Sequence, residues 1–131
     1  MAALPARKND VEIHKQKASH DGDLAEKLQK EGLYPDWVVT CSFYSALHFV
    51  DAYAHTLGVP GFEPAIDDKL SAHQKRLRFI DRCLKDYFGI YEALYNHCRL
   101  CRYDPKYYTL MLPIVPETML KVARKFTTIV K

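Results

Sequence analysis

The sequence has no internal repeat, no low-complexity run and little excess charge of either sign. These absences, together with a modest content of 5 Gly and 7 Pro, exclude collagen-like and disordered chains. With 19 Lys and Arg residues against 16 Asp and Glu residues, the net charge of +3 permits an anionic partner but does not require one. The length of 131 residues leaves room for a single domain, 1–131, with one core.

A signal peptide and an uninterrupted transmembrane segment are also missing. The first ten residues lack the apolar core of a signal peptide. The most apolar stretch, 37–57, has nearly the length of a membrane span, but it carries His48, Asp51 and His55, which would be costly in hydrocarbon. We therefore expect a cytoplasmic protein with no membrane partner, in which this stretch is a buried helix.

No pattern of cysteines requires disulfides or zinc. The four cysteines lie among apolar neighbours inside helical patterns, which favours free thiols in a reducing cytosol over two disulfides. The spacing Cys98-x-x-Cys101 is zinc-like, but no second ligand pair accompanies it. Histidines together with Asp51 are a further set of possible ligands in a helical bundle. We nevertheless expect no metal and no cofactor.

The extended segments all show helical rather than strand periodicity, which predicts an all-α protein. Pro35 and Pro116 suit the first turns of helices, and Gly89 is expected to separate the third helix from the fourth. The expected architecture is an antiparallel up-and-down four-helix bundle over about 9–103, with an additional helix in a C-terminal extension, 104–131. Helices are expected at about 9–32, 35–57, 90–103 and 116–131, and another from about Asp67 or Ser71 to residue 87, with a loop at 58–68 and an irregular apolar stretch at 106–115.

Polar side chains follow one face of the expected 35–57 helix. Tyr44, His48, Asp51 and His55 recur at spacings of four, three and four residues in the most apolar helix of the chain. A buried carboxylate or imidazole costs several kcal/mol unless it is paired, so this line needs partners on neighbouring helices. The candidate partners are His14, the pair His73-x-x-Arg76, the pair Arg99-x-x-Arg102 and Tyr103.

Two interpretations of these residues stay open. In the first, they form a structural network in which an arginine neutralises Asp51 and the histidines bond to carbonyls or hydroxyls. In the second, three arginines bind a phosphate or an RNA backbone, with a histidine close enough for proton transfer. The second interpretation assigns ligand binding to His48, Asp51, His73, Arg76, Arg99, Arg102 and Tyr103, with His73 and His48 as catalytic candidates.

Several motifs follow one another in a recognisable order along 11–103: His14 with Ala18, Asp36-Trp37, Phe43-Tyr44-x-x-Leu47-His48, His73-x-x-Arg76 and Arg99-x-x-Arg102-Tyr103. Together they resemble the small bacterial and archaeal proteins of the HEPN-like class (higher eukaryotes and prokaryotes nucleotide-binding). The resemblance implies an antiparallel four-helix bundle, commonly a homodimer, with a polar cleft at or near the subunit contact. Many members are ribonucleases or toxins, often encoded beside a small nucleotidyltransferase that is then an expected partner, and others bind nucleotides.

The ribonuclease branch of this class has an arginine followed four to six positions later by a histidine, and no histidine follows Arg99 or Arg102 here. We therefore expect a protein that binds a nucleotide or RNA phosphate in an Arg/His-lined cleft between helices. One alternative is a metal-independent, toxin-like ribonuclease that uses the same cleft with His73 or His48 as the base. Another is a non-catalytic dimeric interaction module that pairs through its helices and the segment 107–114.

Overall fold

The computed structural model of the chain describes residues 6–64 and 66–131, and these two ranges contain no strand. The predicted all-α class is confirmed. Within the described residues, none of the helices combines the length and the apolar character that crossing a membrane needs. The helices are α1 (Ala6–Glu31), α2 (Pro35–Thr56), α3 (Ala72–Cys83), α4 (Phe88–Tyr103), α5 (Pro105–Leu110) and α6 (Ile114–Ala123), with the 3-10 helices η1 (Lys85–Tyr87) and η2 (Arg124–Thr128).

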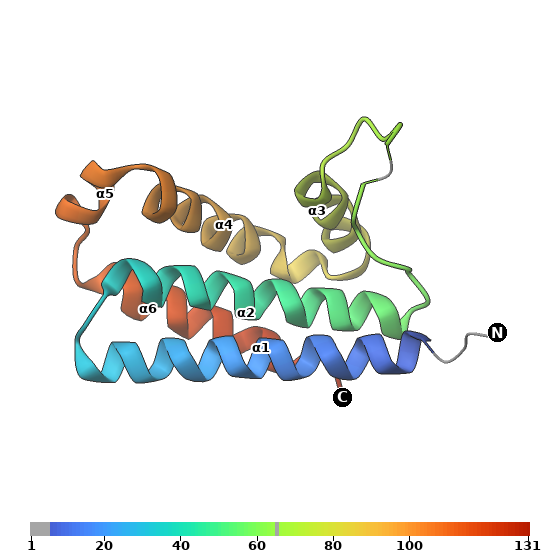
Figure 1. Cartoon of the computed structure of the whole chain (residues 1–131), viewed down its shortest axis with the longest axis horizontal. Coiled ribbons are helices and arrows are strands. Elements are labelled where there is room, and N and C mark those ends of the chain that lie inside the picture. Colours follow the sequence, from blue (N-terminus) through green and yellow to red (C-terminus); the bar gives the residue numbers. More distant parts are fainter. Residues whose placement is uncertain (1–5, 65) are drawn as a thin grey trace.

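The two longest helices, α1 and α2, lie antiparallel and side by side (Figure 1). Gly32 follows α1 with a φ of 68°, a left-handed conformation that glycine adopts without strain. Pro35 begins α2, where its missing N–H breaks no hydrogen bond. Both boundaries agree with the prediction, whereas α1 begins at Ala6, earlier than the expected residue 9.

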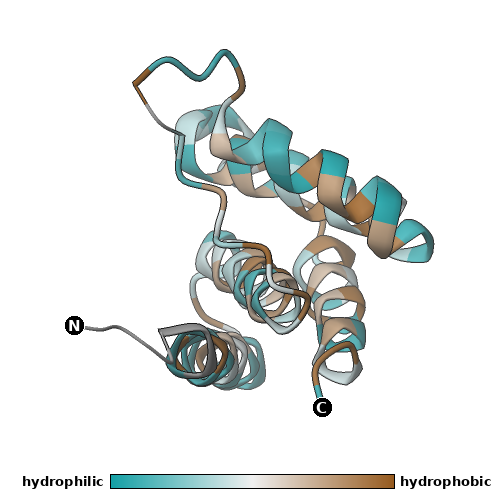
Figure 2. Ribbon diagram, turned by 90° about the vertical axis from the view of Figure 1, so that its right-hand side faces the viewer, coloured by the Kyte–Doolittle hydropathy of each residue, from teal (hydrophilic) through white to brown (hydrophobic). Residues whose placement is uncertain are grey.

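The hydrophobic core lies where α2 meets α4, α6 and η2. Phe43 on α2 contacts Tyr91 on α4, with ring centroids 5.5 Å apart, and Tyr91 contacts Phe126 on η2 at 6.3 Å. Val50 and Leu94 are fully buried in the same cluster. Figure 2 views α1 and α2 nearly end-on, with the C-terminal segment beside them and α3 and α4 above. Each fully buried apolar side chain of this cluster, such as Val50 or Leu94, contributes about 1.5–3 kcal/mol of hydrophobic stabilisation.

The C-terminal segment 104–131, expected as an extension with an additional helix, contributes side chains to this core. Its helix α6 packs along α2. The predicted bundle of the first four helices is not confirmed, because α3 is short and runs across the long axis of the α1–α2 pair (Figure 1). The buried side chains of the C-terminal segment are Pro116, Met119, Leu120, Ala123, Phe126 and Val130.

The junction between α3 and α4 also differs from the prediction. The Ser71 hydroxyl accepts a hydrogen bond from the Gln74 N–H, and the Gln74 side chain accepts one from the Ser71 N–H, so α3 begins with a capping box. It ends at Cys83 because Leu84 leaves the helical conformation (φ −138°, ψ 47°) and buries its side chain. Gly89 lies in the first turn of α4 and separates no helices.

The two segments expected to lack helix behave differently from each other. The stretch 58–64 contains no helix, as predicted. The stretch 106–115 instead contains most of α5, whose first turn is capped by the Asp104 carboxylate accepting from the Lys106 N–H at 3.0 Å. In this part of the chain Met111 packs against the core. The exposed apolar side chains here are Tyr108, Leu110, Leu112 and Ile114.

Candidate functional site

The polar line of α2 reaches α3 through a buried ion pair. Arg76 donates from Nε to Asp51 Oδ1 at 2.8 Å and from Nη2 to Oδ2 at 2.9 Å. The side chains of Asp51 and Arg76 are only 7% and 12% exposed. Burial by itself lowers the pKa of Arg76, but the hydrogen bond to Asp51 and its charge raise that pKa above the ordinary value, so the guanidinium stays charged. This contact matches the structural interpretation, in which an arginine neutralises Asp51.

Three histidines stack beside this ion pair. The Nδ1 atoms of His14 on α1 and His48 on α2 lie 2.9 Å apart, with ring centroids at 5.1 Å, and His55 stacks on His14 at 5.4 Å. Burial lowers the pKa of both His14 and His48, so both rings are neutral at pH 7. His55 is buried, and its Nδ1 has no hydrogen-bond partner in the part of the chain described. We call His14, His48, Asp51, His55 and Arg76 the inner cluster.

His73, near the start of α3, lies between the inner cluster and α4. Its ring stacks on Tyr95 with centroids 3.4 Å apart, and the Arg99 guanidinium carbon lies 5.9 Å from the centroid of the same tyrosine. Burial, and then the charges of Arg76 and Arg99, lower the pKa of His73. The His73 Nδ1 is buried and has no partner among the described residues. His73 is thus a neutral ring among cations, which leaves a ring nitrogen free to act as a base but weakens its basicity.

Arg102, in the last turn of α4, reaches back to α2. Its Nη1 donates a hydrogen bond to the Tyr44 hydroxyl, and its guanidinium carbon lies 5.8 Å from the Tyr44 ring centroid and 5.0 Å from that of Tyr103. The ring of Tyr103 is largely exposed. Neither Arg102 nor Arg99 forms an ion pair with a carboxylate within the residues that the structure describes. Both guanidinium groups therefore keep N–H donors for an anion.

The structure divides the predicted site residues into two sets rather than one recess. His48, Asp51 and Arg76 belong to the inner cluster, together with His14, which the sequence proposed as a partner. Among the three arginines expected at one phosphate, Arg76 already donates two hydrogen bonds to Asp51. The residues on or facing α4 are His73, Arg99, Arg102 and Tyr103.

A hollow of about 400 Å³ opens between α1, α2 and α4, and we call it the interhelical hollow. It joins the two sets, because His48 of the inner cluster and Arg102 of α4 both line it. Lys17 and Trp37 also line it, and sequence reasoning gave neither a role. Their spacing was informative, since Lys17 follows His14 by three positions and Trp37 precedes Tyr44 by seven on α2. The full lining is Lys17, Asp21, Trp37, Thr40, Cys41, Tyr44, His48 and Arg102.

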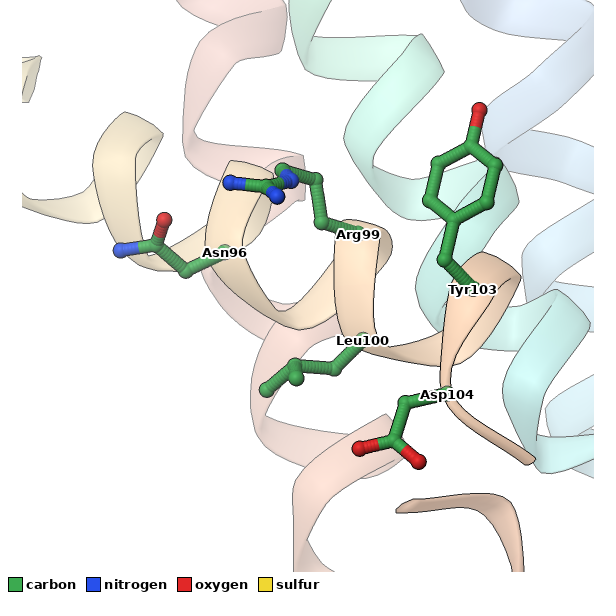
Figure 3. A pocket seen from close by; sticks show the side chains of 5 residues that line it. All are labelled: Asn96, Arg99, Leu100, Tyr103 and Asp104. Atoms are coloured by element: carbon green, nitrogen blue, oxygen red, sulfur yellow. The ribbon is translucent and has the colours of Figure 1, made fainter. Parts of the chain in front are cut away.

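A second hollow of about 400 Å³ lies on the outward side of α4 (Figure 3). Asn96, Arg99, Leu100, Tyr103 and Asp104 line it. Figure 3 shows the ends of Asn96 and Arg99 on the same side, with the ring of Tyr103 pointing away from both. This second hollow is lined by one cationic side chain, Arg99, and by no histidine. It therefore has fewer groups for anion binding and proton transfer than the interhelical hollow.

The thiols near α4 do not form an active nucleophile. All four cysteines are free, as predicted. Burial raises the pKa of Cys98 to about 11 and that of Cys101 to about 12, so neither forms a thiolate at pH 7. The groups at this site that remain able to accept a proton at pH 7 include the neutral histidines, and the guanidinium groups without a carboxylate partner among the described residues include Arg99 and Arg102.

Comparison of the chain with protein-family models, with curated proteins and with solved structures gives no match. The site itself has three features that bear on its chemistry. It contains neutral imidazoles, it contains two arginines without a carboxylate partner among the described residues, and it includes a hollow lined by aromatic rings.

Proposed function

We propose that the chain binds a nucleotide, free or as one unit of an RNA strand, in the interhelical hollow. The observation that carries the proposal is the position of Arg102, whose guanidinium is bonded to the neutral Tyr44 hydroxyl at the edge of a hollow lined by aromatic rings. The volume of about 400 Å³ lies in the range of small-ligand sites. A HEPN-like relationship, which the motif order suggests, agrees with this function.

The charges of the hollow favour a phosphate on one side. Arg102 offers a planar set of N–H donors, which suits two phosphate oxygens at once. Lys17 adds a second positive charge, and it lies 2.9 Å from Asp21 Oδ1. Lys17 and Asp21 are four positions apart on α1, so the two opposite charges largely compensate each other within that helix. The phosphate therefore meets a surface on which the unbalanced charge is that of Arg102.

The aromatic side chains of the hollow favour a base beside the phosphate. The Trp37 side chain is about half exposed although it is the largest apolar side chain in the chain, and Tyr44 lies beside it along α2. Stacking of a base on an aromatic side chain contributes about 1–3 kcal/mol and tolerates any base. We therefore expect weak preference among bases.

The single tryptophan of the chain makes this proposal directly measurable. We expect AMP or a short single-stranded RNA to quench the Trp37 fluorescence in buffer that contains a chelator. Loss of charge-assisted hydrogen bonds in Arg102→Gln weakens binding by about tenfold. Raising the salt concentration weakens it as well, because bound phosphates release counterions.

The matched control is Arg82→Gln, which removes an equal charge from an exposed position on α3. This variant retains the affinity of the unmodified chain. Absence of quenching, or equal quenching in Arg102→Gln and Arg82→Gln, contradicts nucleotide binding in the interhelical hollow.

One observation favours a second function, RNA cleavage without a metal. His48 lines the interhelical hollow, and burial lowers its pKa, so its ring is neutral and able to accept a proton from a ribose hydroxyl. Cleavage of RNA in the presence of a chelator should then disappear in His48→Ala and persist in His20→Ala. Loss in His73→Ala alone would assign the base to His73 instead, and persistence in both variants contradicts this function.

Exposed apolar side chains around α5 support the proposal of a homodimer. Leu110, Leu112 and Ile114 are 76%, 65% and 57% exposed although they are close in sequence. We expect a dimer in light scattering after size-exclusion chromatography, and a monomer for Leu112→Asp. Leu57→Asp, at an exposed leucine after α2, is the control that leaves the dimer intact. A monomeric unmodified chain contradicts this proposal.

A further inference from the structure

Three side chains with metal-binding atoms converge in the inner cluster. One ligand atom each from His14, His48 and Asp51 lies within 4.8 Å of the other two. They come from two helices, because His14 is on α1 while His48 and Asp51 are three positions apart on α2. Elsewhere in residues 6–64 and 66–131, no other three His, Cys, Asp or Glu side chains meet this spacing.

We propose that His14, His48 and Asp51 bind a divalent transition-metal ion of the zinc and cobalt class. Metal–ligand distances of about 2.0–2.1 Å place two donors of one tetrahedral ion about 3.4 Å apart. The two imidazole Nδ1 atoms, 2.9 Å apart, are already near this separation. The other two separations are no more than 4.8 Å, so each shortens to this value by at most about 1.4 Å, which small side-chain rotations provide.

The kind of ion follows from the donor atoms. Imidazole nitrogens select transition metals over magnesium and calcium, which prefer oxygen ligands. Two imidazoles and one carboxylate also leave at least one coordination position open, as in catalytic rather than closed structural sites. Cysteine does not take part, so the site differs from the zinc-like Cys98-x-x-Cys101 spacing.

His14, His48 and the neighbouring His55 have ring nitrogens that lack hydrogen-bond partners among the protein groups described. Two neutral rings that face each other through the same nitrogen share at most one hydrogen bond. Beside them, His55 is 7% exposed and its Nδ1 has no partner among the residues described. Buried polar atoms without a partner are rare in folded proteins, and an ion or ordered water commonly explains them. A water on the ion, next to His14, would give His55 that partner.

Arg76 has two opposite effects on such a site. Its two hydrogen bonds fix the orientation of the Asp51 carboxylate, as groups behind metal ligands generally do. Each carboxylate oxygen keeps a second lone pair for the ion. The positive charge of Arg76 opposes that of the ion, so we expect weaker binding than at a closed structural zinc site.

Titration of the metal-free chain with Co²⁺ alone tests the inference. We expect one equivalent to bind, with visible absorption bands of a nitrogen- and oxygen-ligated ion, and Zn²⁺ to displace it. Zn²⁺ should also raise the melting temperature, because an ion that binds only the folded state stabilises that state. His14→Gln and His48→Gln should each weaken binding at least tenfold. His20→Gln, at a largely exposed histidine on the same helix, keeps the affinity unchanged.

Circular dichroism of His14→Gln and His48→Gln shows whether each variant keeps its helices, so lost binding is separated from lost folding. No Co²⁺ binding by the unmodified chain, or equal binding by the folded His14→Gln variant, overturns the inference. Binding that disappears in a Cys98→Ser and Cys101→Ser double variant also overturns it, because the ion then sits on the thiols. Since the nucleotide titration contains a chelator and this one contains no nucleotide, either proposal can fail while the other stands.

Discussion

Arg76 on α3 donates two hydrogen bonds, of 2.8 and 2.9 Å, to the Asp51 carboxylate on α2. Both side chains are withdrawn from water, so each charge has the other as its main compensation. Removing one partner leaves an uncompensated buried charge, whereas removing both also removes the desolvation cost. The pair therefore holds the position of α3 more than it adds net stability.

The first prediction concerns this ion pair. Asp51→Ala and Arg76→Ala should each lower the free energy of unfolding by about 3–5 kcal/mol, as measured by urea denaturation. The double variant should lose clearly less than the sum of the two single losses. Arg82→Ala, at an exposed arginine of the same helix, should stay within about 0.5 kcal/mol of the unmodified chain. Additive losses would show that the two side chains act independently.

Two buried serines on α2 give the second prediction. The Ser45 hydroxyl donates to the Ala18 carbonyl at 2.7 Å and ties α2 to α1. The Ser42 hydroxyl, equally buried, has no hydrogen-bond partner among the described residues. Ser45→Ala should therefore destabilise the protein by about 1 kcal/mol, while Ser42→Ala is neutral or stabilising. Equal losses in urea denaturation of the two variants would contradict this difference.

Much of the fold was predictable because its boundaries are local. Pro35 begins α2 and Ser71 caps α3 through contacts within a few residues, which the sequence displays directly. The position of α6 was not predictable in this way. Its apolar stripe fits any apolar surface, and packing between residues far apart in the chain decides that it lies along α2. The helix break at Leu84 rather than Gly89 likewise follows from burial of the leucine.

The candidate site was predictable in part for a similar reason. The spacing of His48 and Asp51 on an apolar helix required buried partners, and the expected partners His14 and Arg76 are the ones that the structure supplies. The need for a positive partner did not predict which of Arg76, Arg99 and Arg102 would pair with Asp51. It also gave no role to Trp37, because the interhelical hollow exists only once three helices are assembled.

The third prediction is a loss of stability in acid that arises from His73. Burial, and then the charges of Arg76 and Arg99, lower its pKa in the folded chain. The unfolded chain, in which histidine has a pKa of about 6.5, therefore binds more protons as the pH falls. The stability that the neutral ring contributes is complete above the unfolded-state pKa of about 6.5, and it is lost as the pH falls through the lower pKa of the folded chain. His14 and His48 act in the same direction.

Urea denaturation at a series of pH values from about 7.5 to about 5 measures this effect. The free energy of unfolding should fall steadily over this range for the unmodified chain. In His73→Gln the fall should be shallower, because one of the contributing groups no longer titrates. An identical pH dependence in the variant would show that His73 has the same pKa in both states.

The fourth prediction concerns the order in which the free thiols react. Cys83 is exposed at the end of α3, whereas Cys98 is buried in the core, where burial raises its pKa to about 11. Cys101 is partly exposed, but burial raises its pKa to about 12. Because the thiolate is the nucleophile, iodoacetamide at pH 7.5 should modify Cys83 first, and should reach Cys98 and Cys101 only when the chain unfolds. Peptide mapping of the alkylated chain with and without urea measures this order. Early modification of Cys98 in the folded chain would mean that the packing between α2 and α4 opens readily, and the Arg102 to Tyr44 contact across the same helices would open with it.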